Sequence, residues 1–587
     1  MTQATTRVRL TLPRLASAEL RNVFVGSVAV WEVAVVLVLA VVSGAVAGIS
    51  ALHSSETGAL AVASTAIAFV SIPVQLLAIS IGTDQLAGEF ARGTIAATLA
   101  VAPRRGLVFA AKSLATSTSV IGVGLVAGAV SGGTAMLFWM LPGRTVNGLV
   151  LAGWLTSTAG LALGAGILAW LVLALGALTR QRVAAMLVPI AVLYIVPLSL
   201  ALFTSGATRD WLQACLPSAA LNALMAVRID GGMVTIGLNV GVGIVLTLSA
   251  ALLVLAAWCA LVVPCAALTF VRRDLSSTSP RRAPSTIVRR AVDVGRRQST
   301  PGPGVHRSTG AGRVRSELIK SWSLPSVRWL FVAAIVIETG FGIFRALTGS
   351  VDAAGATPAA GLAVEYGYAL TGGVGGTALI LAVIAGIQIA GEFESGTAIP
   401  TFIAAPRRWQ VTLTKLTSAW LTALAFALPG LLLAGLVVVP LYASRGYPLT
   451  AGVALAGAIC ALKAVLFLML TMSMCAGIAG VTRRSVATIL SACALLVVGP
   501  ALLNTVLGFA RSTDSPLVAI GNAGRFLPWE GARFFYPAEG NASLASVDLD
   551  GVLHVSALFG ILITAFWAVA AVVAWFAADI RRPIRTR

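Results

Sequence analysis

The chain has 587 residues, of which 58% are hydrophobic and only 11% are charged, and its mean hydropathy is +0.94. Soluble globular proteins carry about 25% charged residues, so this composition excludes that class and predicts a multi-spanning membrane protein. The net charge of +20 lies in the two terminal segments, a central segment and short loops. That placement is typical of positive-inside topology, so we expect no nucleic-acid partner.

The first half of the chain begins with a basic segment whose leucines suit a short interfacial helix. Six apolar runs follow, each long enough to cross a bilayer. The predicted spans are 29–50, 59–83, 107–139, 149–177, 184–204 and 237–270.

The segment 274–314 is rich in Arg, Ser, Pro and Gly and has almost no large apolar residues. Such a composition cannot bury a core, so we expect a disordered linker. Its excess of arginine predicts that the linker is cytoplasmic.

The second half repeats the plan of the first, with predicted spans at 328–348, 366–388, 411–441, 449–480, 486–508 and 553–577. Six spans in each half make the halves parallel repeats, because both then enter the membrane from the same side. We therefore predict an all-α polytopic membrane protein with twelve transmembrane helices, built from two six-helix halves at 1–273 and 315–587. Both termini are expected on the cytoplasmic side of the cell membrane.

One polar stretch occurs twice. Gln85–Lys112 reads QLAGEFARGTIAATLAVAPRRGLVFAAK, and Gln388–Lys415 reads QIAGEFESGTAIPTFIAAPRRWQVTLTK. The offset is 303 residues without a gap, and 14 of the 28 aligned positions are identical. Each copy follows a second predicted span, so both are expected at the cytoplasmic face. The starts of the two halves also correspond: the first half has Ala18-Glu19-Leu20-Arg21 and the second has Ser316-Glu317-Leu318-Ile319-Lys320.

Patterns for catalysis are weak in this chain. The closest approach to a phosphate-binding loop is Gly106-LVFAA-Lys112-Ser113, which has Ala111 where that loop needs glycine. The six cysteines contain no CxxC, and the three histidines are scattered, so neither a zinc site nor a disulfide framework is indicated. We expect no enzyme activity, no catalytic residues, no metal and no cofactor held by this chain.

Two ionisable residues in the predicted spans are candidates for a transport pathway, Glu338 and Lys463. Neither recurs in the other half, since at the 303 offset Glu338 is aligned with Val35 and Lys463 with Gly160. The alternative interpretation is a single helix–helix contact or snorkelling to the interface.

The repeated stretch resembles the segment between the second and third spans of ABC transporter permeases of the ABC type-2 exporter class. That family pattern is a Glu, a Gly-Thr, a Pro followed by a basic residue, and a Lys. The resemblance extends to the leading Glu-Leu-x-Lys/Arg helix and the six-span plan, although Arg21 directly follows Leu20 in the first half. It implies a fused pair of permease halves that export an antibiotic, a drug or a lipid-like substrate.

The resemblance also implies partners and site residues. Two copies of a separately encoded ATP-binding subunit would use ATP and Mg²⁺ and dock on the two stretches, which act as coupling helices in the lipid bilayer. The residues expected to dock are Gly88, Glu89, Phe90, Gly93, Thr94, Gly391, Glu392, Phe393, Gly396 and Thr397. The residues expected to anchor the segments at the cytoplasmic face are Pro103, Arg104, Arg105, Lys112, Pro406, Arg407, Arg408 and Lys415.

From the residues alone we expect Gly88 and Gly93 to bracket a sharp turn, with Glu89 and Phe90 offering a charge and a ring to the partner. The simpler interpretation is that these are turn residues and topological anchors. Two other classes of function stay open: an ion-coupled secondary transporter with parallel repeats, and a membrane-embedded enzyme or assembly scaffold.

Overall fold

A computed structural model represents the protein. It describes residues 11–25, 27–52, 58–197, 206–229, 232–234, 246–273, 309–348, 358–398, 401–402, 407–447, 449–500, 503, 507, 516–535, 552–553 and 555–581.

Helices make up nearly all of the described part of the first half. They are α1 (Leu12–Val25), α2 (Ser27–Leu52), α3 (Ala59–Arg92), α4 (Ile95–Val101), α5 (Arg105–Met140), α6 (Gly148–Thr179), α7 (Arg182–Ile190) with its π-helical continuation η1 (Ala191–Ile195), α9 (Gly206–Ala214), α10 (Pro217–Met225) and α11 (Leu248–Arg272). Two three-residue strands, β1 (Val227–Ile229) and β2 (Gly232–Val234), pair as an antiparallel hairpin.

The second half follows the same order. Its elements are α13 (Gly310–Trp322), α14 (Pro325–Thr348), α15 (Pro358–Thr371), α16 (Val374–Ala385), η4 (Gly386–Ala390), α17 (Gly391–Ser395), α19 (Arg408–Ser444), α20 (Ala451–Thr482), α21 (Ser485–Cys493), η5 (Ala494–Val498), α23 (Pro516–Asn522), η6 (Ala523–Phe526), η7 (Pro528–Phe534) and α24 (Ala557–Arg581). The starts of α5, α6 and α7 and those of α19, α20 and α21 are each 303 residues apart.

Ten helices in the described part of the chain are long and apolar enough to cross a membrane. They begin at Ala29, Ala59, Arg105, Gly148, Leu248, Pro325, Gly361, Arg408, Ala451 and Ala557. Two shorter apolar helices, Arg182–Tyr194 and Ser485–Val497, lie where the fifth and eleventh spans are predicted. The chain is thus a helical multi-pass membrane protein, as its composition predicts.

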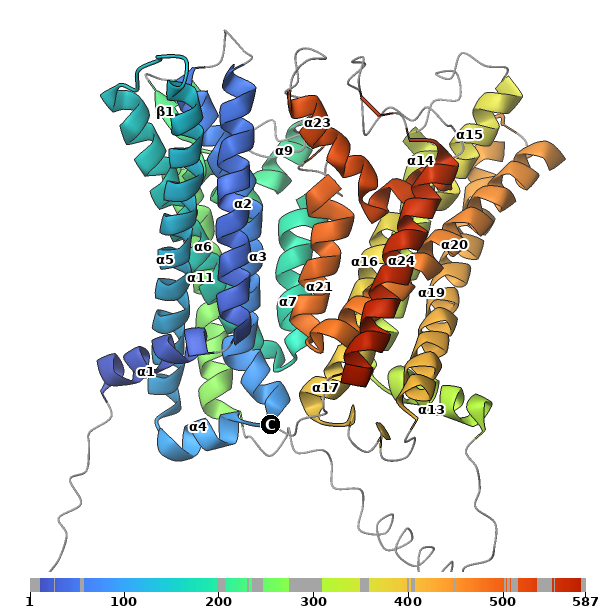
Figure 1. The fold of residues 1–587 in the computed structure, drawn as a ribbon, viewed down its shortest axis with the longest axis horizontal. Coiled ribbons are helices and arrows are strands. Elements are labelled where there is room, and N and C mark those ends of the chain that lie inside the picture. Colours follow the sequence, from blue (N-terminus) through green and yellow to red (C-terminus); the bar gives the residue numbers. More distant parts are fainter. Residues whose placement is uncertain are drawn as a thin grey trace, which may run out of the picture.

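The long helices run in roughly the same direction and pack as bundles, with some helices lying behind others (Figure 1). The helices of the first half gather on one side and those of the second half on the other, with α7 and α21 between them (Figure 1). One apolar core crosses between the halves, because Met186 of α7 belongs to the same buried cluster as Val486 and Ile489 of α21. The short elements α1, α4, α13 and α17 all lie at the same end of the long helices (Figure 1).

Small residues allow close helix contacts in the second half. A Cβ added at Gly480 of α20 would lie only 2.1 Å from Cδ1 of Trp575 on α24. Trp575 is 1% exposed and belongs to the main core of this half. Packing of a large ring against a glycine is a common way for membrane helices to approach closely.

The structure corrects several boundaries expected from the sequence. The eighth span was expected to end at 388, but the helical run continues to Ser395. The sixth span was expected from 237, but α11 begins at Leu248 after the N-cap Thr247. The second span was expected to end near residue 83, but α3 continues as a helix to Arg92. The linker was expected to reach 314, but α13 begins at Gly310 because the side chain of Thr309 accepts a bond from Gly312 N and caps the helix. The rest of the predicted linker, 274–308, lies outside the described residues.

Candidate functional site

The first copy of the repeated stretch is a helix, a turn and a second short helix. Helix α3 ends at Gly93, which has a left-handed φ of 72°, and α4 follows from Ile95. Gly93 is the residue that suits this conformation, because a side chain there would be strained. The expected turn at Gly88 is wrong, since Gly88 lies inside α3 and the direction changes only at Gly93. Pro103 and Arg104 separate α4 from α5.

The second copy has the same turn. Helix α17 ends at Gly396, whose φ is 75°, and Gly391 lies within the helical run. The hydroxyls of Ser395 and Thr397 lie 2.9 Å apart at this turn. Pro406 falls outside the described residues.

A buried lysine connects the first copy to the leading helix. Lys112 Nζ of α5 lies 2.8 Å from Glu89 Oε1 of α3 and 2.9 Å from Glu19 Oε2 of α1. Its side chain is 0% exposed. Thr98 of α4 donates to the other oxygen of Glu89 at 3.3 Å. One lysine therefore holds three helices together, and Glu89 extends the connection to α4.

The second copy contains the same cluster with an added cation. Lys415 Nζ lies 2.6 Å from Glu392 Oε2 and 2.9 Å from Glu317 Oε2, and Lys320 forms ion pairs with both carboxylates. Burial alone would raise the pKa of Glu317, but the attraction and hydrogen bonds of Lys415 and Lys320 lower it below its ordinary value. Two cations face two anions here, whereas the first cluster has one cation for two anions.

These clusters change the expected role of Glu89 and Phe90. Both residues were expected to face a partner, yet each is only 8% exposed. Phe90 packs edge-on against Phe270 and lies under the guanidinium of Arg180, 5.0 Å from its ring centre. Their side chains fill the interior because α3 continues past Gly88. Both side chains pack inside the protein, so the exposure expected of them is wrong, while contact of either with a partner stays a prediction.

Glu392 and Phe393 occupy the equivalent places. Glu392 is 5% exposed, and Arg483 lies over the ring of Phe393 at 4.7 Å. Arg180 and Arg483 are the non-glycine residues with positive φ in the described backbone, at 53° and 54°, and each ends a long helix. The sequence contained a signal for them, because Thr179-Arg180 and Thr482-Arg483 match at the 303 offset.

The arginines that start α5 and α19 bind the last helix of each half. Arg105 donates to the carbonyl oxygen of Arg273 at 2.9 Å, and Arg408 donates to that of Asp579 at 2.7 Å. Arg483 also forms an ion pair with Asp579 at 3.1 Å. Favourable binding of cations at helix C-termini is general, because the carbonyl groups there carry partial negative charge.

The exposed part of the first copy is α4 and its flanks. Helix α4 buries Ile95 and Leu99 against Phe90 and exposes Val101, which is 73% exposed. Arg92 and Arg104 are exposed at its two ends. In the second copy Arg407 is exposed and Ala398 is buried, and most of the segment between them lies outside the described residues.

One ion bridge joins the two halves and has no counterpart among the described residues. Arg182 at the start of α7 lies 2.5 Å from Asp84 of α3 and 2.6 Å from Glu394 of α17. Glu394 also accepts bonds from Ser485, from its backbone N at 3.0 Å and its hydroxyl at 2.7 Å. Ser485 is the residue 303 positions after Arg182, so Glu394 contacts equivalent positions of both halves.

The two candidate pathway residues lie apart from this site. Glu338 is 3% exposed and accepts a bond from Thr377 at 3.1 Å, while its Oε1 has no hydrogen-bond partner among the described residues. Gly373 and Gly430 allow neighbouring helices to close around it. Lys463 lies 5.2 Å from the ring centre of Phe534. The structure does not bring these two residues into one site.

Comparison with models of protein families gives no match, and comparison with curated proteins gives no significant match. Within the described residues, no group of three His, Cys, Asp or Glu side chains could hold a metal ion.

Proposed function

We propose that this chain is the membrane permease of an ATP-driven exporter of the ABC type-2 kind. It would have twelve transmembrane helices in two parallel six-helix halves, with both repeated stretches, both termini and the linker in the cytoplasm. Two copies of a separate ATP-binding subunit would hydrolyse ATP with Mg²⁺ and move the halves. The substrate would be a small or lipid-like molecule that leaves the cytoplasm or the inner leaflet.

The observation that carries this proposal is the duplicated lysine cluster at one end of the molecule. In each half a lysine bonds the glutamate of the repeated stretch and the glutamate of the leading helix. Force applied to α4 would reach three helices through Thr98, Glu89 and Lys112. A short exposed helix connected in this way to buried ion pairs suits a part that a partner moves.

The docking surface in this proposal is the exposed face of α4. Its centre is small and apolar, ending in Val101, and Arg92 and Arg104 flank it. An apolar centre with a charged rim is the usual anatomy of a protein interface. The partner would offer an apolar cleft with acidic residues at its edge.

A second candidate function rests on Glu338. A buried carboxyl with one unpartnered oxygen among the described residues could bind a proton, as the carboxyls of ion-coupled transporters do. This alternative predicts transport that continues without ATP while a proton gradient remains. The ABC proposal predicts transport that stops when ATP is removed.

Copurification with the soluble P-loop ATPases of the same cell tests the docking surface. Val101→Glu places a charge on the most exposed apolar residue of α4, at its C-terminal end, whereas Leu141→Glu places one at a residue of nearly equal exposure, 71%, after the far end of α5. We expect Val101→Glu to lose the ATPase and Leu141→Glu to keep it. Retention of the ATPase by both variants would rule out α4 as the docking surface.

A further inference from the structure

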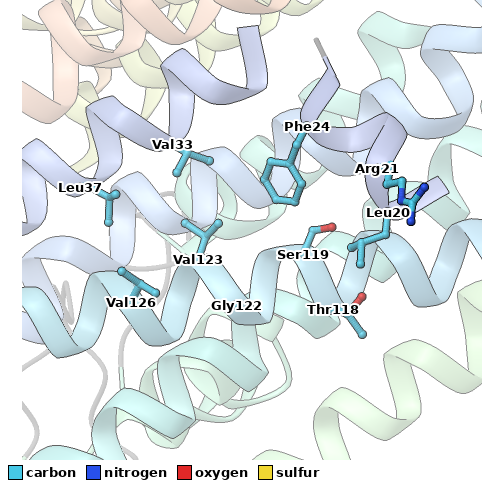
Figure 2. Close-up of a pocket in the computed structure, with 10 residues that line it drawn as sticks. All are labelled: Leu20, Arg21, Phe24, Val33, Leu37, Thr118, Ser119, Gly122, Val123 and Val126. Carbon is cyan, nitrogen blue, oxygen red and sulfur yellow. The ribbon is translucent and has the colours of Figure 1, made fainter. Parts of the chain in front are cut away.

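A lateral groove lies between α1, α2 and α5. It has a volume of about 860 Å³ (Figure 2). Its lining includes Leu20, Arg21 and Phe24 from α1. Gly122 and Val126 contribute from α5. The groove is separate from the surface of α4 and from the ion bridge between the halves.

The groove changes from polar to apolar along its length. Figure 2 shows Arg21 at one end and Leu37 and Val126 at the other. From Thr118 to Val126 the lining follows two turns of α5, roughly 12 Å of helix. An anionic group joined to a long apolar chain would match both ends of the groove.

The cationic end of the groove is not neutralised by the protein. Among the described residues no carboxylate pairs with Arg21, and Arg14, seven positions earlier on the same face of α1, likewise has none. Glu19 is the single acidic residue of α1, and it is buried against Lys112. In the second half, by contrast, Lys320 is paired with Glu317 and Glu392.

The apolar end continues onto surface that faces the bilayer. On α2, Val35 and Val38 are exposed, and on α5 Leu125 and Val126 are exposed. Both helices belong to the membrane-spanning set. The molecules next to such a surface are lipids.

We propose that this groove binds an anionic phospholipid, with the phosphate at Arg21 and one acyl chain along α5 towards Val126. Juxtamembrane arginines attract anionic headgroups, and an interfacial amphipathic helix adds apolar contact for the chain. In the described part of the second half we infer no such site, because Lys320, one position beyond the equivalent of Arg21, is already paired with Glu317 and Glu392.

The lipid would also steady the leading helix. Arg21 lies two residues from Glu19, whose carboxylate reaches Lys112 and through it Glu89. A bound lipid therefore holds α1 in the position that completes the lysine cluster. This inference does not depend on the ATP-driven function, and either can fail without the other.

Native mass spectrometry of the purified full chain tests the proposal. Phosphatidylglycerol, phosphatidylcholine with the same acyl chains, and glycerophosphate without chains serve as three probes. Arg21→Ala removes the headgroup contact. Gly122→Leu fills the groove, and its added Cβ meets no atom within 4 Å, so the helix itself is not disturbed.

Two matched controls separate the groove from general effects. Gly106→Leu makes the same change on α5 outside the groove, again with no atom within 4 Å of the new Cβ. Arg315→Ala removes an exposed arginine from the leading helix of the second half. We expect both controls to bind as the unchanged protein does.

The expected result is specific binding of phosphatidylglycerol that falls about fivefold in Arg21→Ala, with partial recovery in Arg21→Lys. Binding should also fall in Gly122→Leu, because the new side chain takes the place of the acyl chain. Equal binding of phosphatidylcholine would overturn the proposal, because the charge would then play no part. Equal binding of glycerophosphate, or unchanged phosphatidylglycerol binding in Gly122→Leu, would also overturn it, because the groove would then hold no acyl chain.

Discussion

Arg182 and Glu394 form an ion pair of 2.6 Å that joins the first half of the molecule to the second. Arg182 begins α7, and Glu394 lies in the second copy of the repeated stretch. The first copy has Ala91 where the second has Glu394. The two copies therefore differ at the position that contacts the opposite half. The second copy forms the ion pair with Arg182 through Glu394, and Ala91 of the first copy cannot form one.

We predict that loss of this bridge weakens the contact between the halves. Arg182→Met leaves the carboxylates of Asp84 and Glu394 without their cation, and both are only partly exposed. The expected loss is about 1–3 kcal/mol, because solvent screens part of the interaction. A double-mutant cycle of Arg182→Met with Glu394→Gln, followed by thermal unfolding, measures it. Additive effects of the two changes would show that the pair does not couple the halves.

A second prediction concerns the unequal lysine clusters. Lys112→Met leaves Glu19 and Glu89 buried without a cation, which should cost about 3–5 kcal/mol. Lys415→Met should cost less, because Lys320 still pairs with Glu317 and Glu392. Unfolding temperatures of the two variants in one detergent make the comparison.

The double variant Lys320→Met/Lys415→Met is the control for this difference. It removes both cations of the second cluster and should lower stability as much as Lys112→Met does. A loss in Lys415→Met equal to that in Lys112→Met would contradict the compensating role of Lys320.

A third prediction concerns pH and the packing of α13. The pKa of Glu317 in the folded protein is lowered from its ordinary value of 4.5. Its contribution to the stability of the folded protein is therefore complete above pH 4.5 and is lost as the pH falls through the lower pKa of the folded state. Burial opposes the charge of Lys320, but its bonds to Glu392 and Glu317 raise the pKa of Lys320 from 10.5. Its contribution is therefore complete below pH 10.5 and is lost as the pH rises through the folded value.

Hydrogen exchange of α13 measures this dependence. Protection of the helix should be constant across the neutral range and should fall in strong acid. In Glu317→Gln the acid transition should be smaller, because one of the carboxylates that must be protonated is gone. An acid transition of undiminished size in that variant would mean that Glu317 does not hold α13 in place.

A fourth prediction concerns the close contact of α20 and α24. In Gly480→Ala the new methyl group would lie 2.1 Å from Trp575, so one helix must shift, at a cost of about 1–3 kcal/mol. Gly452→Ala on the same helix meets no atom within 4 Å. We expect the unfolding temperature to fall in Gly480→Ala and to stay unchanged in Gly452→Ala. Equal temperatures would show that the ring of Trp575 moves aside freely.

Apolar runs predicted most of the fold, because a membrane helix needs a continuous apolar stretch of sufficient length. The predicted second span nevertheless ended early. Polar residues such as Asp84, Gln85 and Glu89 interrupt the apolar pattern, but a helix continues through them because each side chain lies inside the protein or at an ion pair. Hydropathy identifies the part of a helix that crosses the bilayer, and it misses the part of α3 that continues beyond the bilayer to Arg92.

The candidate site was predicted in position and not in detail. The repeat located Glu89 and Lys112, and the matching Glu19 and Glu317 located the leading helices. The pairing of these residues could not be read from the sequence, because Glu19 and Lys112 lie 93 positions apart and meet only after packing. Glu394 was visible as a difference between the copies, yet its partner Arg182 is in the other half.

In the proposed function, α4 contacts an ATP-binding subunit. A photocrosslinking amino acid at Val101, with Leu141 as the control position of similar exposure, tests this contact in living cells. We expect mass spectrometry of the Val101 adduct to identify a soluble P-loop ATPase, and the Leu141 position to give no such adduct. If Val101 crosslinks only to lipid, or yields the same proteins as Leu141, α4 does not contact an ATPase.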